Sequence, residues 1–289
     1  MSRMICLAVL MHSGLLVRAM TLAEDGQAHA TIVIPDDPSA AEQTAAAELA
    51  RVLKRISGAD FQVVMASQAD EDGSRLLVGP SRSARAHLGD AVVDGFGAEE
   101  FIVRTLGSDL LLVGGRPRGT LYAVMSFLGH DLGCRWTTWY GDESIPRRTT
   151  LSVPTLDRRD APAMAVRDVV THQNQTSDRQ AVQRFLVHNR CQGPDLRFTG
   201  DVSAVGDTSH RFAYPPDGWL VHTLFQWLPP EQHFASHPEW YSLAGDTRVA
   251  TRQLCFTNPG LREALTEAVL KRIGEADPGG LYSVSAMDW

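Results

Sequence analysis

The spacing of apolar residues predicts short strands that alternate with amphipathic helices over residues 30–153. Apolar or β-branched runs of four to seven residues predict strands, and a Gly107-Ser108 turn joins the last two as a hairpin. The predicted strands are residues 30–34, 61–65, 75–78, 100–106 and 109–113. This alternation is typical of a small α/β domain, in which helices pack against a sheet.

The first long helix of this domain has clear signals at both ends. Ser39 and Glu42 have the spacing of a capping box, and Gly58 stands where the helix should end. The apolar residues between them recur at helical spacing on one face: Ala45, Leu49, Val52, Leu53 and Ile56. A second, short helix is predicted at residues 81–88.

The segment LLLVGGRPRGTLYAVMSFLGHDLGCRW, which ends at Trp136, is the most specific pattern in the chain. Its first residues lack alternation, which predicts a strand covered on both faces. The turn and helix signals that follow are Gly114, Gly115, Pro117 in a first helical turn, and Gly133 at the helix end. Apolar residues keep the helical period between them: Leu121, Val124, Met125 and Leu128.

The glycines of this segment do not form a nucleotide-binding motif. The phosphate-binding loop G-x-x-x-x-G-K-[ST] requires a lysine that reaches the phosphates, but Thr120 stands in that place. The dinucleotide fingerprint G-x-G-x-x-G is also absent. We therefore interpret Gly114 and Gly115 as a tight strand-to-helix turn, and we expect no cofactor.

A polar stretch with two prolines, PTLDRRDAP, predicts a linker at residues 154–163. Beyond it, strands are predicted at residues 164–170, 221–225, 253–256 and 281–285, with helices at 178–189, 230–237 and 261–273. Strands that alternate with helices are typical of parallel βα units. Residues 164–289 are about half of the ~250 residues that a complete eight-fold barrel needs. The predicted fold class is α/β: a small N-terminal α/β sandwich domain, then an incomplete (β/α)8 TIM-type barrel.

Composition and charge narrow the classes of partner. Hydrophobic residues make up 44% of the 289 residues and charged residues 21%, which suits globular domains. The net charge of -7 argues against a nucleic-acid surface. Four cysteines, without any C-x-x-C, predict buried free thiols rather than a disulfide framework or a zinc site: Cys6, Cys134, Cys191 and Cys255.

Residues 1–29 have the features of an export signal and leader. Arg3 precedes the apolar residues 4–17, and Thr21-Leu22-Ala23 offers small residues for cleavage. The apolar run is too short for a membrane span. We expect a secreted or periplasmic protein with no membrane span; the alternative is a cytosolic N-terminus.

These motifs carry a resemblance to carbohydrate-active proteins. IVIPDDPSAAEQTAAAELARVLKRISG, LLVGPS and the segment ending in GCRW resemble the non-catalytic α/β domain before the barrel of alpha-glucuronidases and family 20 hexosaminidases. VHTLFQWLPPEQHFASHPEWYSL, QLCFTNP and SVSAMDW resemble an uncharacterised bacterial barrel family often attached to that domain. The resemblance covers residues 30–289 and implies glycoside hydrolysis or glycan recognition, with a glycan or polysaccharide as partner. Its members run beyond this length, so the chain looks like a fragment.

The resemblance also implies a catalytic carboxylate. Barrel enzymes place their active groups at the C-terminal ends of strands, and Asp288 follows the fourth predicted strand. In the resembled glycosidases a catalytic acid lies at that strand end, so Asp288 is the candidate acid; the alternative is a rim residue that caps a helix. Glycoside hydrolysis usually needs a second carboxylate or the substrate's own acetamido group, and no second carboxylate has comparable placement.

Four residues are candidates for holding the sugar. Arg167 looks similar to the first-strand arginine that grips sugar hydroxyls in the hexosaminidases, but an ion pair with Asp168 is equally consistent. His222 is a candidate hydrogen-bond partner or a core histidine, and Asn258 is a candidate contact or a helix cap. Trp289, like Trp227, has a ring that could stack on a pyranose, although tryptophans are commonly part of a core.

Other chemistries have weaker support. His233 and His237 have the i, i+4 spacing of a metal pair, but the glutamate of H-E-x-x-H is missing and Pro238 ends the helix, so we expect no metal. No G-x-S-x-G occurs. The leading hypothesis is acid-assisted cleavage of a glycosidic bond; the alternatives are a glycan-binding module without turnover and an inactive fragment.

Overall fold

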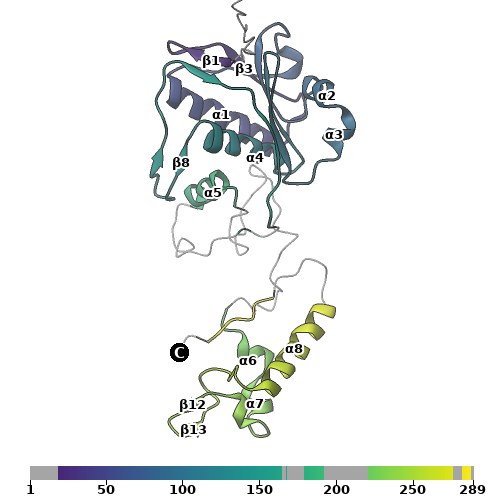
Figure 1. Cartoon of the computed structure of the whole chain (residues 1–289), viewed down its shortest axis with the longest axis vertical. Helices are drawn as coiled ribbons and strands as arrows, with labels where there is room; N and C mark the ends of the chain where they lie inside the picture. The colour runs from purple at the N-terminus through teal and green to yellow at the C-terminus, as the bar shows by residue number, and fades with distance from the viewer. Residues whose placement is uncertain (1–18, 165–166, 168–178, 192–220, 276–281, 288–289) are drawn as a thin grey trace, which may run out of the picture. The chain divides into compact units, whose positions relative to one another are not determined.

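The computed structural model describes residues 19–164, 167, 179–191, 221–275 and 282–287 (Figure 1). These residues fall into two compact units, and each is treated by itself. The α/β unit contains residues 19–164 together with residues 179–190. The C-terminal unit contains residues 221–275 and 282–287.

A six-stranded mixed sheet forms the centre of the α/β unit, with the strand order β11-β6-β7-β5-β3-β4. Strands β4, β3, β5 and β7 run parallel; β6 pairs antiparallel with β7, and β11 pairs antiparallel with β6 at the edge of the sheet. The strands are β3 (Ala30–Ile34), β4 (Val63–Met65), β5 (Ser74–Val78), β6 (Phe101–Leu106), β7 (Asp109–Gly114) and β11 (Asp157–Asp160). The predicted strands and the β6–β7 hairpin are therefore present.

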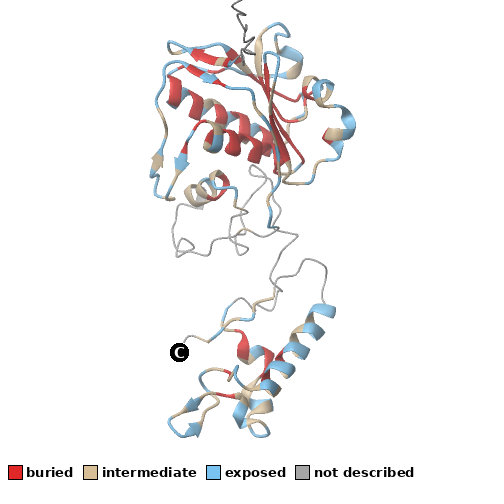
Figure 2. Cartoon of the chain, in the orientation of Figure 1, coloured by how far each residue is buried: buried red, intermediate tan, exposed pale blue. Residues whose placement is uncertain are grey.

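Helices cover both faces of this sheet (Figures 1 and 2). Alternate residues of the strands pack against α1 (Ala40–Ser57) and α4 (Gly119–Ser126) on one face. The intervening residues pack toward α2 (Arg82–Leu88) on the other face, where α3 (Asp90–Asp94) follows. A π-helical turn, η2 (Phe127–Asp131), continues α4. The fully buried strand β7 explains why its sequence lacks polar alternation.

The expected ends of α1 are confirmed, while the start of α4 differs from the prediction. The backbone N–H of Glu42 donates to Ser39 Oγ and that of Ser39 to the Glu42 carboxylate, and Gly58 ends the helix at φ 81°. Helix α4 begins at Gly119 rather than at Pro117, which follows a cis peptide bond.

A second, smaller sheet lies where a leader was expected. Its order is β10-β1-β2, with β1 (Met20–Glu24), β2 (Gln27–Ala28) and β10 (Leu151–Val153). Leu22 and Ala23 are fully buried in the same core as α1. Cleavage at residues 21–23 would remove β1 from this sheet, so the proposed cleavage position is incompatible with this fold.

The stretch expected as a linker contains an edge strand of the main sheet. Strand β11 pairs with β6, and its charged side chains meet charges of opposite sign. Arg104 and Asp157 lie directly opposite each other with Nε and Oδ1 2.7 Å apart, and Arg159 Nε lies 2.6 Å from Glu100 Oε1. The composition looked like that of a linker because an exposed edge strand uses charges for cross-strand pairing.

The remaining short elements complete the α/β unit. A 3-10 turn, η1 (Ala66–Gln68), follows β4, and β8 (Arg135–Trp136) pairs with β9 (Glu143–Ser144). Helix α5 (Arg179–His188) confirms the predicted helix and packs through Val187 into the core of this unit.

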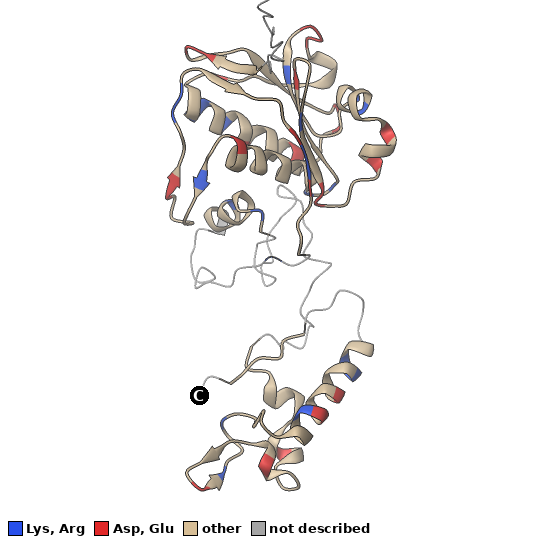
Figure 3. Ribbon diagram, viewed as in Figure 1, with Lys and Arg blue, Asp and Glu red and all other residues tan. Residues whose placement is uncertain are grey.

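The C-terminal unit is built from helical turns, one hairpin and one long helix. Its elements are α6 (Leu224–Trp227), α7 (Pro230–His233), the 3-10 turn η6 (Pro238–Trp240), β12 (Leu243–Ala244), β13 (Thr247–Arg248) and α8 (Pro259–Gly274). Its buried side chains form one small core: Leu224, Trp227, Leu228, Tyr241, Leu254, Leu261 and Leu265. The charged side chains of α8 are Arg262, Glu263, Glu267, Lys271 and Arg272, so both signs occur along this helix (Figure 3).

The predicted barrel strands are largely not formed here. Residues 224–227 are helical, with the N–H groups of Gln226 and Trp227 both donating to Thr223 O, so the predicted strand at 221–225 is wrong. Residues 253–256 make only one isolated bridge, between Leu254 and Tyr241. Within the described ranges the fold is mixed α/β without a closed barrel, and the strand at 164–170 lies mostly outside them. None of the helices in these ranges combines the length and apolar character needed to cross a membrane.

Candidate functional site

The segment that leads to Asp288 is held in a fixed place in the C-terminal unit. Asp288 and Trp289 lie outside the described residues, but residues 282–287 immediately before them are described. This segment belongs to no helix or strand. Its position therefore depends on hydrogen bonds from neighbouring side chains.

Thr223 bonds this segment through both its hydroxyl and its backbone N–H. Its Oγ1 donates to Ser283 O at 2.8 Å and accepts from Ser285 N at 3.0 Å, while its backbone N–H donates to Ser285 O at 3.1 Å. Trp227 Nε1 also donates to Ser283 O, at 2.8 Å. Thr223 is fully buried and Trp227 nearly so, which shields these bonds from water. The indole of Trp227 is thus part of the core and not a sugar platform.

Gln253 and His222 hold the end of the segment. The Gln253 amide forms a two-way pair with the backbone of Met287: Oε1 accepts from Met287 N at 3.1 Å, and Nε2 donates to Met287 O. His222 Nδ1 lies 3.1 Å from Ala286 O, and because a carbonyl only accepts, Nδ1 carries the proton of this bond. His222 has a left-handed backbone, with φ 56°. The predicted residue His222 therefore contacts Ala286, which stands two residues before Asp288 in the sequence.

The sequence reasoning missed Thr223, Gln253, Ser283 and Ser285. One signal was available: Ser283 and Ser285 alternate, so in an extended segment they lie on the same face. Their partners are about 60 residues away, and only the folded chain shows that they meet.

The other predicted residues have structural roles or are described only in part. Asn258 caps α8, because its Oδ1 accepts from Leu261 N at 3.1 Å. Arg167 is half-buried, but Asp168, its expected partner, lies outside the described residues. His237 stacks on Trp240 with ring centroids 4.0 Å apart, and His233 lies on the same ring at 5.8 Å. No cluster of three or more potential metal ligands occurs among the residues that the structure describes.

Two groups near this core have shifted pKa values. Burial raises the pKa of Tyr241 to about 12, and its hydroxyl donates to Leu228 O. A hydrogen bond from Thr257 lowers the pKa of the Cys255 thiol, and Arg248 lowers it further. Tyr241 is therefore a neutral structural donor at ordinary pH.

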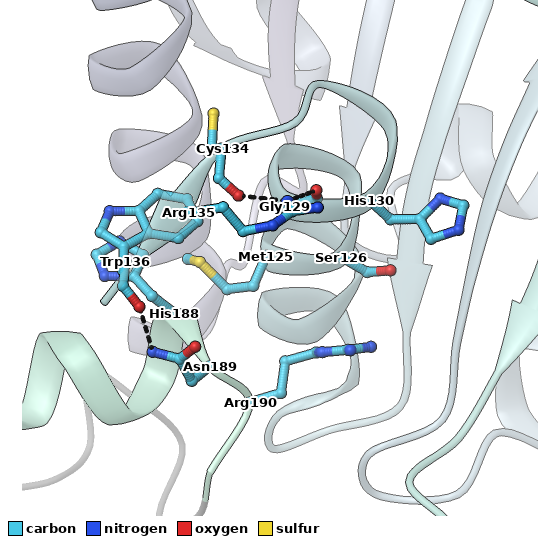
Figure 4. Close-up of a pocket in the computed structure, with 10 residues that line it drawn as sticks. All are labelled: Met125, Ser126, Gly129, His130, Cys134, Arg135, Trp136, His188, Asn189 and Arg190. Carbon is cyan, nitrogen blue, oxygen red and sulfur yellow. Dashed lines mark hydrogen bonds between the residues drawn. The ribbon is translucent and has the colours of Figure 1, made fainter. Parts of the chain in front are cut away.

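A cavity of about 270 Å³ opens in the α/β unit between the end of α4, β8 and α5 (Figure 4). Trp136 and His188, which both line it, stack face to face with ring centroids 4.1 Å apart and planes within 4°. Asn189 Nδ2 donates to Trp136 O at 3.2 Å, and the Arg135 guanidinium donates to the backbone of Gly129 and Cys134. The Trp136–His188 stack and the Asn189 bond connect the end of α5 to β8, so this cavity lies where α5 packs against the rest of the unit.

The thiol beside this cavity is not a nucleophile. Cys134 is buried, and burial raises its pKa to about 11. Since the thiolate is the reactive form, the neutral thiol behaves as a small apolar side chain. The prediction of a buried free thiol is confirmed at Cys134, whereas Cys191 and Cys255 are only partly buried, so burial was wrongly predicted there.

Comparisons with known proteins give a family but no activity. A family model described as "Domain of unknown function (DUF4838)" matches residues 136–289. No curated protein matches the chain. Among solved structures, a family GH115 4-O-methyl-alpha-glucuronidase described as specific for decorated arabinogalactans is similar at 12% identity and a TM-score of 0.46. The similarity covers 91% of this chain but only 36% of that one, and likeness at this level carries no argument.

The matched region crosses the boundary between the two units. It begins at Trp136 and therefore includes β9, β10, β11 and α5, which pack in the α/β unit. A single family model therefore matches both the last strands of the α/β unit and the C-terminal unit.

Proposed function

The chain belongs to the family described as "Domain of unknown function (DUF4838)", and we propose that it is a carbohydrate-active protein that cleaves glycosidic bonds. Asp288 is the proposed general acid. The observation that carries this proposal is the anchoring of residues 282–287 by Thr223, Trp227 and Gln253.

This anchoring suits a catalytic group because catalysis requires a fixed geometry. A reacting side chain must keep its position within a fraction of an ångström, and buried partners that are themselves hydrogen-bonded achieve this. Met287 is bonded at both its N–H and its C=O to Gln253. Met287, the residue before Asp288 in the sequence, is therefore held at both of its backbone polar groups.

In the proposed reaction the Asp288 carboxyl group donates its proton to the glycosidic oxygen as the bond to the anomeric carbon breaks. A second carboxylate, or an acetamido group of the substrate, stabilises the anomeric carbon until water adds. Arg167 and His222 bind sugar hydroxyls, and Trp289 stacks on the ring. Asn258 is assigned to the helix cap, because Leu261 N already bonds its oxygen.

A glycan-binding module without turnover is the second candidate. Among the described residues, the side chains that bond residues 282–287 are hydroxyl, amide, imidazole and indole groups, with no carboxylate among them. Such groups bind sugar hydroxyls without supplying a base or a nucleophile. This set of groups favours glycan binding without cleavage as the second candidate.

The test is hydrolysis of aryl glycosides and of glucuronoxylan by the full chain, with two variants. We expect Asp288→Asn to lower turnover by about 10²- to 10⁴-fold, the usual contribution of a general acid. Asp246→Asn, at the exposed tip of the β12–β13 hairpin, is the matched control and should leave turnover unchanged. Equal turnover in both variants removes Asp288 from the mechanism, and binding without any turnover supports the second candidate.

Export to the periplasm or the medium is a further part of this proposal, because most polysaccharides lie outside the cytoplasm. Cell fractionation with sequencing of the mature N-terminus tests it. The buried strand β1 leads us to expect cleavage before Met20 and not within Thr21–Ala23.

A further inference from the structure

A second cavity, of about 470 Å³, lies at the carboxyl ends of β3, β5 and β7 in the α/β unit. Pro35 follows β3, Pro80 follows β5 by two residues, and Gly114 and Gly115 end β7. The volume falls within the range of small-molecule sites, ~300–1,000 Å³. None of the residues that line it also lines the cavity between α4, β8 and α5, and all of them belong to the α/β unit.

The topology of the sheet explains why a cavity forms there. The chain leaves β3 toward α1 on one face of the sheet, and it leaves the neighbouring β5 toward α2 on the opposite face. Adjacent parallel strands whose connections diverge in this way leave a crevice at their carboxyl ends, where open α/β sheets commonly bind ligands.

The base of the cavity is rigid backbone. A Cβ on Gly115 would lie 2.1 Å from Gly97 O, and one on Gly114 would lie 2.5 Å from Glu100 O. Gly115 N also donates to Glu100 O at 2.9 Å. This close packing requires glycine and fixes the loop, so a ligand would meet a preformed surface.

Two arginines with different environments form the polar walls. Arg116 donates through Nε and Nη2 to both oxygens of buried Glu42, each at 3.0 Å, and also to Asp37 O. Arg85 is paired with Asp90 and Asp94 at 3.0 and 2.9 Å, but both carboxylates are largely exposed. Exposed pairs of this kind contribute little stability, so Arg85 can exchange a carboxylate for a ligand at low cost.

The charges of the cavity select against anions. Asp37 and Asp94 line it beside Arg85 and Arg116, and the two arginines already face Glu42 and Asp90. Carboxylates therefore outnumber guanidinium groups around the opening. A phosphate or a uronate would meet net repulsion, whereas a ligand with hydroxyl groups can accept from the arginines and donate to the aspartates.

An apolar wall completes the cavity. Phe96 lines it together with Pro35, Pro80 and Val93. The guanidinium of Arg159 lies 5.2 Å from the centre of the Phe96 ring and supports it. An aromatic ring beside paired donors and acceptors fits the two kinds of surface on a sugar, its apolar C–H face and its hydroxyl edge.

We propose that this cavity binds a neutral sugar ring, which gives the α/β unit a glycan-binding site of its own. The assignment rests on the cavity's residues and not on Asp288, so it stands or falls independently of the proposed hydrolysis.

The test is a titration of the full ¹⁵N-labelled chain with the methyl glycosides of glucose, galactose, mannose and xylose, followed by NMR. We expect at least one of them to shift the backbone amides of Gly114 and Gly115 and the Arg85 Nε–H signal. Methyl glucuronide and inorganic phosphate, at equal concentration and ionic strength, should shift them less. Arg85→Gln should weaken the binding about tenfold or more, because it removes charged hydrogen bonds.

Arg104→Gln is the matched control, since Arg104 is also a partly exposed arginine paired with one exposed aspartate in the same unit. It should bind like the parent chain, and thermal melts should show both variants folded. Asp288→Asn should leave these shifts unchanged, which separates this site from the proposed reaction. Binding of none of the four glycosides at these amides, tighter binding of the anions, or equal binding by the two arginine variants would overturn the proposal.

Discussion

The two units of this chain are stabilised in different ways. The α/β unit buries more than 30 side chains in one apolar cluster around the main sheet, with a second cluster on the sheet's other face. Among its described residues, the C-terminal unit buries seven apolar side chains in one cluster, and side-chain hydrogen bonds hold residues 282–287 (Figure 2). Because apolar stabilisation grows with buried area, the first unit depends chiefly on packing. In the second unit, individual polar contacts carry a larger share.

This difference matters for function. A rigid sheet with glycine-packed loops provides the preformed cavity at the ends of β3, β5 and β7. In the C-terminal unit, residues 282–287, which precede the proposed catalytic residue, depend on a few hydrogen bonds to Thr223 and Gln253. Substitutions in the two units should therefore affect different properties.

The largest expected effect is the loss of packing in the α/β unit. Leu49 of α1 is fully buried, and Leu49→Ala should lower the free energy of unfolding of this unit by ~4 kcal/mol, through lost burial and a residual cavity. Leu270→Ala, on the exposed side of α8, is the matched control and should change stability by less than ~0.5 kcal/mol. Calorimetric unfolding measures the stability of both variants. Similar losses of stability in Leu49→Ala and Leu270→Ala would contradict the difference in packing between the two units.

The next effect is the acid sensitivity of the α5 contact. Burial opposes ionisation of Glu48, but hydrogen bonds from Arg51 and from His188 of α5 lower its pKa from 4.5 to about 2. A lowered folded-state pKa stabilises the fold above pH 4.5, and this contribution is lost as the pH falls from about 4.5 to about 2. The contribution is up to about 3 kcal/mol.

Glu48→Gln tests this linkage. We expect the variant to lose most of the acid dependence of unfolding between pH 4.5 and 2, as measured by thermal melts at a series of pH values. Glu263→Gln, on the exposed side of α8, should keep the dependence of the parent chain. If both variants behave like the parent, Glu48 does not hold α5 in the α/β unit.

The smallest effect is expected in the C-terminal unit, at the threonine that anchors residues 282–287. Thr223→Val keeps the shape but removes the hydroxyl that bonds Ser283 O and Ser285 N, which should cost about 1–3 kcal/mol. Hydrogen exchange at Ser285 should become faster, while exchange in β7 stays the same. Thr247→Val, on the exposed β13, should change neither. Unchanged exchange at Ser285 would contradict the anchoring.

The sequence predicted much of the α/β unit because its local signals agree with its tertiary contacts. The β3, β5, β6 and β7 strands and α1 have strong periodicity and end signals, and the structure contains them. Strand β11 was missed because its charges looked like those of a linker, although they pair across the edge to Arg104 and Glu100. The predicted strand at 221–225 failed because Thr223 begins a helical turn and bonds a distant segment.

The candidate sites also depend on contacts between residues far apart in the sequence, which the sequence did not predict. Asp288 and His222 were identified from the sequence, but no pattern linked His222 to Ala286, since the two are 64 residues apart. The cavity beside Arg85 and Arg116 was likewise not predicted from the sequence, because its residues come from three strand ends and the loops that follow them.

The sequence by itself determined the main strands and helices of the α/β unit, its glycine turn and the caps of α1 and α8, since each depends on residues within one or two helical turns. The tertiary structure alone decided which charges pair across the sheet, where a cavity opens and what anchors the segment before Asp288. Those features depend on contacts between residues far apart in the chain, and hydrophobic periodicity does not encode such contacts.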